Sequence, residues 1–185
     1  MIKVRFKKLN EKAELPKYAH KGDIGMDVKA IGVEYDADTD TYIYYTGLAC
    51  ETKCGVGIFG MMRSSNYKTD CYLTNGVGLI DSATYRGDIQ FRYKNRTSMK
   101  TRIELEALRI WNRMSFFSRL CTNYDEVYVK AEENCMNNAL RYAPYEVGDK
   151  IGQLVAIEFG ETSTKLVKKL SETERGESGH GSTGK

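Results

Sequence analysis

The sequence predicts an all-β fold, a sandwich or a barrel, that is interrupted once by helices. Two observations predict it. Short β-prone runs, separated by glycine or polar clusters, recur along most of the 185 residues, which is typical of sandwiches and barrels. Between residues 95 and 145 the apolar side chains recur at helical intervals instead. The length suits one domain, or one domain with an insertion, that can bury a core.

The strands are predicted from local composition. Residues 2–6 alternate apolar and basic side chains, which is a strand pattern. Residues 41–46 are rich in Tyr, Ile and Thr and follow a polar turn at residues 36–40. The other predicted strands are the β-prone runs at residues 48–51, 56–61, 71–73, 89–93, 151–159 and 165–170.

The helical segment shows two amphipathic patterns. The first has apolar residues from Ile103 to Leu120, with Glu and Arg between them, and a weaker one spans residues 125–140. Such a stripe covers a sheet or packs on itself. We therefore predict a β domain from residues 1–94 and 146–173, a helical insertion at 95–145, and a flexible arm at 174–185. The arm is expected to be flexible because the last fifteen residues contain four glycines and no apolar side chain.

Charge and composition exclude several classes of protein. Lys plus Arg is 28 and Asp plus Glu is 25, a net charge of +3, so neither a nucleic-acid nor a membrane partner is expected. No apolar run is long enough to span a bilayer, and the charged first residues lack the apolar core of a secretory signal. The five cysteines are odd in number and indicate reduced thiols in the cytoplasm. Cys50 and Cys54 have no second pair at zinc-site spacing.

Several segments suggest phosphate chemistry. The C-terminal GHGSTGK matches a phosphate-binding loop only in part, because the final Ser or Thr and the following helix are missing. Its glycines and hydroxyls still suit an arm that orders over a polyphosphate. Arg63, Ser64 and Ser65 follow a predicted strand and would make a compact anion clamp. Arg63 is equally open to interpretation as the ion-pair partner of a carboxylate such as Asp81.

The remaining segments place carboxylates and amides at turns. Asp27 follows the glycines of GDIGMD, and Gln153 begins a strand after the turn of GDKIGQL. The segment NGVGLID sets Asn75 and Asp81 six residues apart around a glycine-containing hairpin. A pocket built there could bind a base at one end and activate water at the other.

Taken in order, these five segments resemble the five motifs of the trimeric deoxyuridine triphosphatases (dUTPases). GDIGMD is similar to the first motif, RSS to the second, NGVGLIDSATYRGD to the third, GDKIGQL to the fourth and RGESGHGSTG to the fifth. The resemblance covers nearly the whole chain except residues 95–145.

The resemblance implies a distorted jelly-roll or β-barrel subunit, a homotrimer with shared active sites, and magnesium-assisted hydrolysis of dUTP to dUMP and pyrophosphate. Asp81 would be the catalytic residue that orients the attacking water, and Asp27 would hold Mg²⁺ through water. Asn75 would bond the uracil edge, and Tyr85 would lie under the deoxyribose and exclude a ribose. The other implied substrate-binding residues are Gly76, Leu79 and Ile80 at the base, Arg63, Ser64, Ser65 and Gln153 at the phosphates, and Arg175, His180, Gly181, Ser182 and Thr183 in the arm.

The sequence departs from the family pattern at three places. Three residues separate Asp81 from Tyr85 where the family usually has two. His180 stands where the fifth motif normally has a phenylalanine, and Met62 stands where a proline usually precedes RSS.

Two alternative functions stay open. A dCTP deaminase shares the RSS segment and the trimeric fold, but it needs a glutamate where this chain has Arg92. A regulatory protein with this fold would use the helical segment to bind an unknown protein partner.

Overall fold

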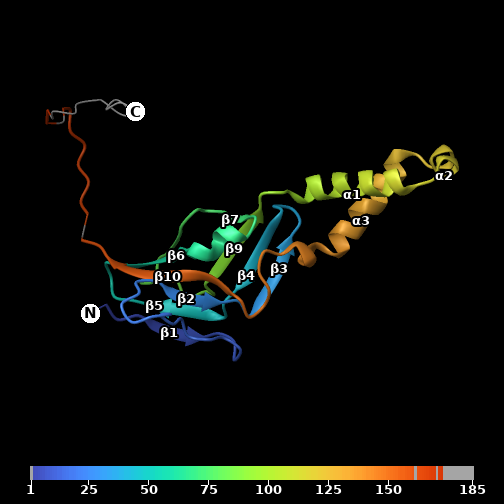
Figure 1. The fold of residues 1–185 in the computed structure, drawn as a ribbon. Helices are drawn as coiled ribbons and strands as arrows, with labels where there is room; N and C mark the ends of the chain where they lie inside the picture. Colours follow the sequence, from blue (N-terminus) through green and yellow to red (C-terminus); the bar gives the residue numbers. More distant parts are fainter. Residues whose placement is uncertain (1, 161, 170, 173–185) are drawn as a thin grey trace.

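The computed structural model describes residues 2–160, 162–169 and 171–172 (Figure 1). Within these residues, strands make up most of the regular structure before and after one helical segment. The elements, in chain order, are β1 (Arg5–Lys8), β2 (Met26–Lys29), β3 (Gly32–Asp36), β4 (Thr41–Tyr45), β5 (Leu48–Glu51), β6 (Val56–Met61), the 3₁₀ helix η1 (Ser64–Lys68), β7 (Cys71–Leu73), β8 (Gly78–Ile80), β9 (Gln90–Asn95), α1 (Met99–Arg113), α2 (Phe116–Cys121), α3 (Tyr124–Asn137), the 3₁₀ helix η2 (Ala139–Tyr142) and β10 (Lys150–Glu158).

Two four-stranded antiparallel sheets form the body of the fold. Their strand orders are β2-β10-β6-β8 and β3-β4-β9-β7, and β1 pairs with β5 in a small third sheet. Side chains from both large sheets fill one core, in which Tyr44, Ile58, Tyr93 and Leu154 are all fully buried. The all-β prediction is confirmed, but each large sheet keeps two edge strands, so the sheets do not close into a barrel.

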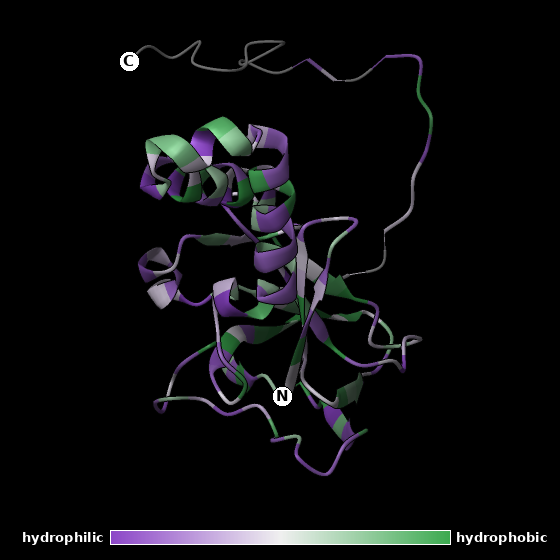
Figure 2. Ribbon diagram, turned by 90° about the vertical axis from the view of Figure 1, so that its right-hand side faces the viewer, coloured by the Kyte–Doolittle hydropathy of each residue, from purple (hydrophilic) through white to green (hydrophobic). Residues whose placement is uncertain are grey.

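The helices between β9 and β10 form a second core. Met99, Ile103 and Ala107 on α1 pack against residues of α3 at the same four-residue spacing, including Val127 and Ala131. The helical pair therefore packs on itself, and it extends away from the sheets (Figure 1). Both helices carry hydrophobic and hydrophilic residues (Figure 2), and no helix among the described residues is long and apolar enough to cross a membrane.

The structure corrects several strand boundaries and removes one strand. The N-terminal strand is Arg5–Lys8 instead of 2–6, and β9 is Gln90–Asn95 instead of 89–93. The bounds of β4 and β10 differ from the predicted ones by one residue. The run at 165–170 forms no strand in its described part, residues 165–169, where Leu166 is 99% exposed. Its β-prone composition has no neighbouring strand to pair with, and an unpaired strand is not stable alone.

Candidate active site

Asp27 in β2 is the centre of a polar cluster. Its Oδ1 accepts hydrogen bonds from Arg63 Nε at 3.0 Å and Gln153 Nε2 at 3.1 Å, and its Oδ2 accepts one from Lys150 Nζ at 2.8 Å. Burial acts to raise the pKa of Asp27, but the hydrogen bonds from its three partners outweigh burial, so its pKa lies below the ordinary value. Asp27 is therefore ionised at neutral pH. Through these hydrogen bonds it links the segments GDIGMD, RSS and GDKIGQL.

Strand register produces this cluster. Gln153 in β10 lies opposite Asp27 on one side and opposite Met61 of β6 on the other. Arg63 follows β6 by two residues, so its side chain reaches back across β10 to Asp27. The ion-pair interpretation of Arg63 is correct in kind, but the carboxylate is Asp27 and not Asp81.

The two serines lie beside this cluster at the start of η1. Ser65 Oγ accepts a hydrogen bond from Arg63 Nη1 at 3.2 Å, and the Ser64 side chain is exposed. Arg63 thus holds one serine hydroxyl and one carboxylate with the same guanidinium. The arrangement leaves Ser64 free to face an anion.

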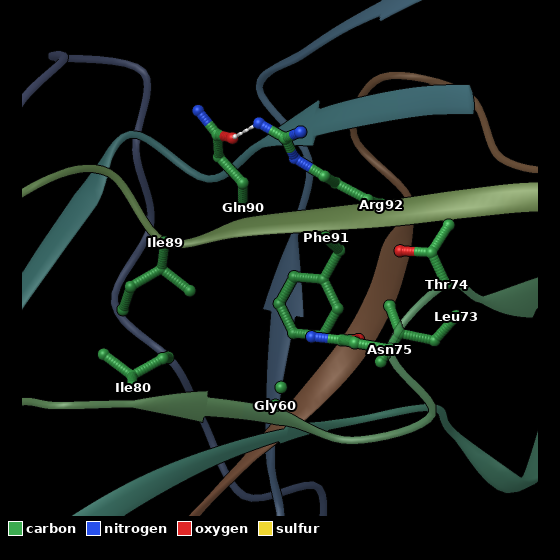
Figure 3. Close-up of a pocket in the computed structure, with 10 residues that line it drawn as sticks. Gly60, Leu73, Thr74, Asn75, Ile80, Ile89, Gln90, Phe91 and Arg92 are labelled. Carbon is green, nitrogen blue, oxygen red and sulfur yellow. Dashed lines mark hydrogen bonds between the residues drawn. The ribbon is translucent and has the colours of Figure 1, made fainter. Parts of the chain in front are cut away.

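Asn75 lines a cavity of about 170 Å³ between β6 and β8 of one sheet and β7 and β9 of the other. In Figure 3 the Phe91 ring lies between Ile80 and Ile89 on one side and Asn75 on the other, with Gly60 beneath. Gln90 and Arg92 lie on the opposite side of β9, as alternation along a strand requires. The lining residues are Gly60, Leu73, Thr74, Asn75, Gly78, Ile80, Ile89, Gln90, Phe91 and Arg92.

The segment around Asn75 is not a hairpin of two paired strands. β7 pairs with β9 in one sheet, whereas β8 pairs with β6 in the other, so the turn crosses between sheets. The turn is closed by the hydrogen bond from Gly76 N to Leu73 O, at 2.9 Å, and Gly76 has φ +66°. Asn75 and Ile80 line the cavity, while Leu79 alternates to the far face of β8 and lines an apolar groove with Asp81.

A compact turn accommodates the extra residue between Asp81 and Tyr85. The Asp81 carbonyl accepts hydrogen bonds from Thr84 N at 2.9 Å and from Tyr85 N at 2.7 Å. The second bond closes a five-residue turn, which is one residue wider than a β-turn. Asp81 is exposed, and Tyr85 is 48% exposed with its hydroxyl donating to Asp88 O at 3.1 Å.

Asp27 and the strand that leads to Asp81 lie at opposite edges of one sheet. The Asp27 cluster is centred on β2 and β10, and β8 follows at the other edge. Three strand spacings of ~4.8 Å separate β2 from β8, a distance of about 14 Å. Among the described residues, no hydrogen bond or ion pair joins Asn75, Asp81 or Tyr85 to the Asp27 cluster.

The described residues of one chain do not fit a resident magnesium site. No group of three or more His, Cys, Asp or Glu side chains that could hold a metal occurs among them. The Asp27 side chain is 4% exposed, and two of its three partners are cationic. Holding Mg²⁺ through a water, as the sequence leads us to expect, would require Asp27 to give up part of this network.

The predicted arm residues cannot be placed. Arg175, His180, Gly181, Ser182 and Thr183 lie outside the described residues. Their role at the phosphates and the base stays a prediction from the sequence.

Comparison with known proteins identifies the family. A deoxyuridine 5'-triphosphate nucleotidohydrolase of a Picosynechococcus strain is 30% identical to the chain over 183 residues, which cover 98% of both proteins. The chain belongs to the dUTPase family. A second relative of the same name, from Clostridioides difficile, is 26% identical over 185 residues and covers 100% of this chain and 99% of its own length. No family model matches the chain.

Solved dUTPase structures share the fold. The dUTPase of Staphylococcus bacteriophage 80alpha, solved with dUPNHPP, aligns with a TM-score of 0.65 and 22% identity over 98% of both chains. The dUTPase of phage phi11 of S. aureus, whose structure visualises a species-specific insert, aligns with a TM-score of 0.58 and 18% identity over 92% of this chain and 99% of its own. That residues 95–145 are an insertion relative to the family stays a prediction.

The sequence analysis did not predict three features of the candidate site. Lys150, the third partner of Asp27, stands within GDKIGQL, and its positive charge next to a turn was the available signal. Phe91 is buried in the main core and lines the cavity, which no local pattern indicates. The third feature is a buried hydrogen bond between Thr52 and Ser82, which only the folded chain brings together.

Proposed function

We propose that the protein hydrolyses dUTP to dUMP and pyrophosphate. The full-length likeness to a named dUTP nucleotidohydrolase carries this proposal. The geometry supports it, because Asn75 lines a cavity that both polar and apolar residues form, and Asp81 follows β8 with an exposed carboxylate. A planar base fits such a cavity, and an amide side chain can donate to and accept from its polar edge.

Asp81 would orient the attacking water and accept its proton. A positioned base of this kind contributes about 10²–10⁴-fold to a rate. Arg63, Ser64, Ser65 and Gln153 would supply directed donors to the phosphates, whose charge must be stabilised in the transition state. Tyr85 would pack under the sugar, where half of its ring is available.

Magnesium dependence is part of the proposal, but ligation by Asp27 alone is not supported. When bound, Mg²⁺ would neutralise phosphate charge, and it commonly enters such sites on the phosphates themselves. A structural Mg(II) ion is described for a mutant dUTPase of phage phi11. Activity measured before and after chelation would test the metal requirement.

Homotrimers with shared sites are the proposed assembly. Within one chain, β2 with Asp27 and β8, which leads to Asp81, are three strand spacings or about 14 Å apart, and no described hydrogen bond or ion pair joins Asp81 or Asn75 to the Asp27 cluster. A partner chain that brings its own Asp27 cluster to the Asn75 cavity would complete one site.

The deaminase alternative has no support in the cavity. Proton transfer at a cytosine ring needs a carboxylate, and neither Asp nor Glu is among the described lining residues. Arg92 stands where a dCTP deaminase needs a glutamate, and its side chain lies on the far side of β9 from Phe91 (Figure 3).

A turnover assay tests the proposed function. The purified protein is given dUTP, UTP, dTTP or dCTP with Mg²⁺, and pyrophosphate and ammonia are both measured. We expect pyrophosphate from dUTP, little from the other three, and no ammonia. Ammonia from dCTP, or equal rates for dUTP and dTTP, would refute the proposal. Asp81→Asn should retain nucleotide binding but lower kcat by about 10²-fold or more.

A further inference from the structure

Ser82, the residue directly after Asp81, is fully buried. Its relative exposure is 0%, although Asp81 and Thr84 on either side of it in the loop are exposed. The Ser82 hydroxyl lies 2.5 Å from the hydroxyl of Thr52, which is itself 9% exposed. A buried hydroxyl is retained only when its hydrogen bonds are satisfied, and this pair satisfies both members.

The hydroxyl pair is hydrogen-bonded to the segment that connects β5 to the start of β6. The Val56 carbonyl lies within hydrogen-bond distance of both hydroxyls, 3.0 Å from Thr52 Oγ1 and 3.1 Å from Ser82 Oγ. Thr52 N also donates to Ser82 O at 3.2 Å. Ser82 is therefore held through its side chain and its backbone by the same short segment, residues 52–56.

A second contact holds the outer side of the loop. Arg86 donates from Nη1 to Ser82 O at 3.0 Å and to Tyr85 O at 2.8 Å, and from Nη2 to Ala83 O at 3.0 Å. The same guanidinium also forms an ion pair with Glu51 of β5, with 3.6 Å between Nη2 and Oε1, and both side chains are exposed. The Arg86 contacts therefore lie at the surface, whereas the hydroxyl pair of Thr52 and Ser82 links the Asp81 loop to the buried interior.

Asp81 itself lacks such support. Its carboxylate makes no hydrogen bond or ion pair with any residue that the structure describes. Its direction toward a substrate must therefore be set by the backbone at residues 81 and 82. A catalytic group needs placement within a fraction of an ångström, and a displacement of 1 Å can cost about 10²-fold in rate.

We propose that Thr52 and Ser82 are positioning residues, whose buried hydroxyl pair fixes the orientation of the Asp81 carboxylate for hydrolysis. The inference rests on the proposed function, since it assigns Asp81 the water. It adds two residues that never touch the nucleotide. Because base and phosphate contacts lie elsewhere, loss of the pair should lower kcat and leave KM nearly unchanged.

Thr52→Val tests the inference, because it keeps the shape of the side chain and removes the hydroxyl. We expect kcat for dUTP to fall about 10–100-fold, with KM within about twofold of the wild type. Thr52→Ser keeps the hydroxyl and should restore kcat. If Thr52→Val does not fold, Thr52→Ala removes the same hydroxyl in a smaller side chain and carries the same test.

The matched control is Thr41→Val in β4. Thr41 is also buried, at 4% exposure, and its hydroxyl donates to the Thr39 carbonyl at 3.1 Å. It lies in the other sheet, so its loss should lower stability without lowering kcat. An equal loss of kcat in Thr41→Val would show that destabilisation alone explains the effect and would overturn the inference.

A double-mutant cycle separates positioning from general damage. In an Asp81→Asn background, Thr52→Val should cause little further loss of kcat, because the group it positions is already disabled. A further loss as large as in the wild type would overturn the inference. So would an unchanged kcat in Thr52→Val. A fully active Asp81→Asn, by contrast, would remove the proposed role of Asp81 itself.

Discussion

The Asp27 carboxylate and the Arg63 guanidinium form an ion pair with 3.0 Å between Oδ1 and Nε, in which the Asp27 side chain is 4% exposed. Lys150 and Gln153 complete the network around the carboxylate. A nearly buried charge is stable only with such partners, since its desolvation would otherwise outweigh any single attraction. The network fixes the second segment, with its serines, against β2 and β10.

We predict that Asp27→Asn lowers the free energy of unfolding by about 1–3 kcal/mol at neutral pH. The folded-state pKa of Asp27 lies below its ordinary value of 3.8. Ionised Asp27 therefore stabilises the fold above that value, and this contribution is lost as the pH falls through the folded-state pKa. The difference in the free energy of unfolding between the wild type and Asp27→Asn should therefore become smaller as the pH falls.

Denaturant unfolding at neutral pH and near pH 3 measures this difference, with all proteins at one chain concentration. The exposed Asp38 provides a control, and Asp38→Asn should have little effect at either pH. An Asp27→Asn penalty that is the same at both pH values would contradict the assigned network.

Gly152→Ala should destabilise the protein through Phe91. A Cβ atom at Gly152 would lie 2.2 Å from Phe91 Cε1 and 2.7 Å from Cζ, and Phe91 is 2% exposed. Either the ring or β10 must move, at a cost of about 1–3 kcal/mol or more. Thermal unfolding measures the cost, and Gly160→Ala is the matched control because a Cβ there meets nothing within 4 Å. Phe91→Leu should recover part of the loss in the double variant, and a neutral Gly152→Ala would refute the packing described.

How far the sequence predicts this fold depends on whether the information is local. β5, β6 and β7 have the predicted bounds because short apolar runs between turn residues identify them. The sequence does not predict β2 and β3, since Met26–Lys29 and Gly32–Asp36 contain charged residues. β2 owes its strand form to the distant β10, whereas β3 pairs with the neighbouring β4. β-propensity depends on such context.

The helical segment and the candidate site show the same limit. The first helical pattern was predicted as continuous to Leu120, but the helix ends at Arg113 and Ser115 caps a new one by accepting from Ser118 N. The turn at Asn75 has the predicted glycines. However, β7 pairs with β9 and β8 pairs with β6, and these partners lie elsewhere in the sequence. The composition identified Asp27 and Arg63 separately, and only the register of β10 brings them into contact.

Tyr85→Ala should narrow the preference for dUTP over UTP. The Tyr85 ring is held by its hydroxyl bond to Asp88 O and lies so close to Gly87 that a Cβ there would be 2.3 Å from the Tyr85 hydroxyl oxygen. A ring fixed in this way can exclude a 2′-hydroxyl by contact. The ratio of kcat/KM for the two nucleotides measures the effect, and Tyr67→Ala, at an 82% exposed tyrosine, is the control. An unchanged ratio would assign the discrimination to another group.

Mixed oligomers should reveal shared active sites. One chain carries Asp81→Asn, and the other carries Ser64→Ala with Ser65→Ala, so that each homo-oligomer is nearly inactive. If a site takes Asp81 from one chain and the serines from another, co-refolded mixtures regain a fraction of wild-type activity. Light scattering should give a trimer for each preparation. Mixtures as inactive as their components, although mixed trimers form, would place each site within one chain.

Removal of residues 174–185 should leave the oligomer intact and lower kcat/KM for dUTP. This segment has no apolar anchor, and its donors at Arg175, Ser182 and Thr183 suit phosphate oxygens. Ordering twelve residues costs on the order of 10 kcal/mol of backbone entropy, so protection from hydrogen exchange should increase only with a non-hydrolysable dUTP analogue and Mg²⁺. His180→Phe should keep or improve analogue binding, because a phenyl ring stacks on a base with more area than imidazole, and His180→Ala should weaken it. Equal exchange of the segment with and without the analogue would show that it does not close over the nucleotide.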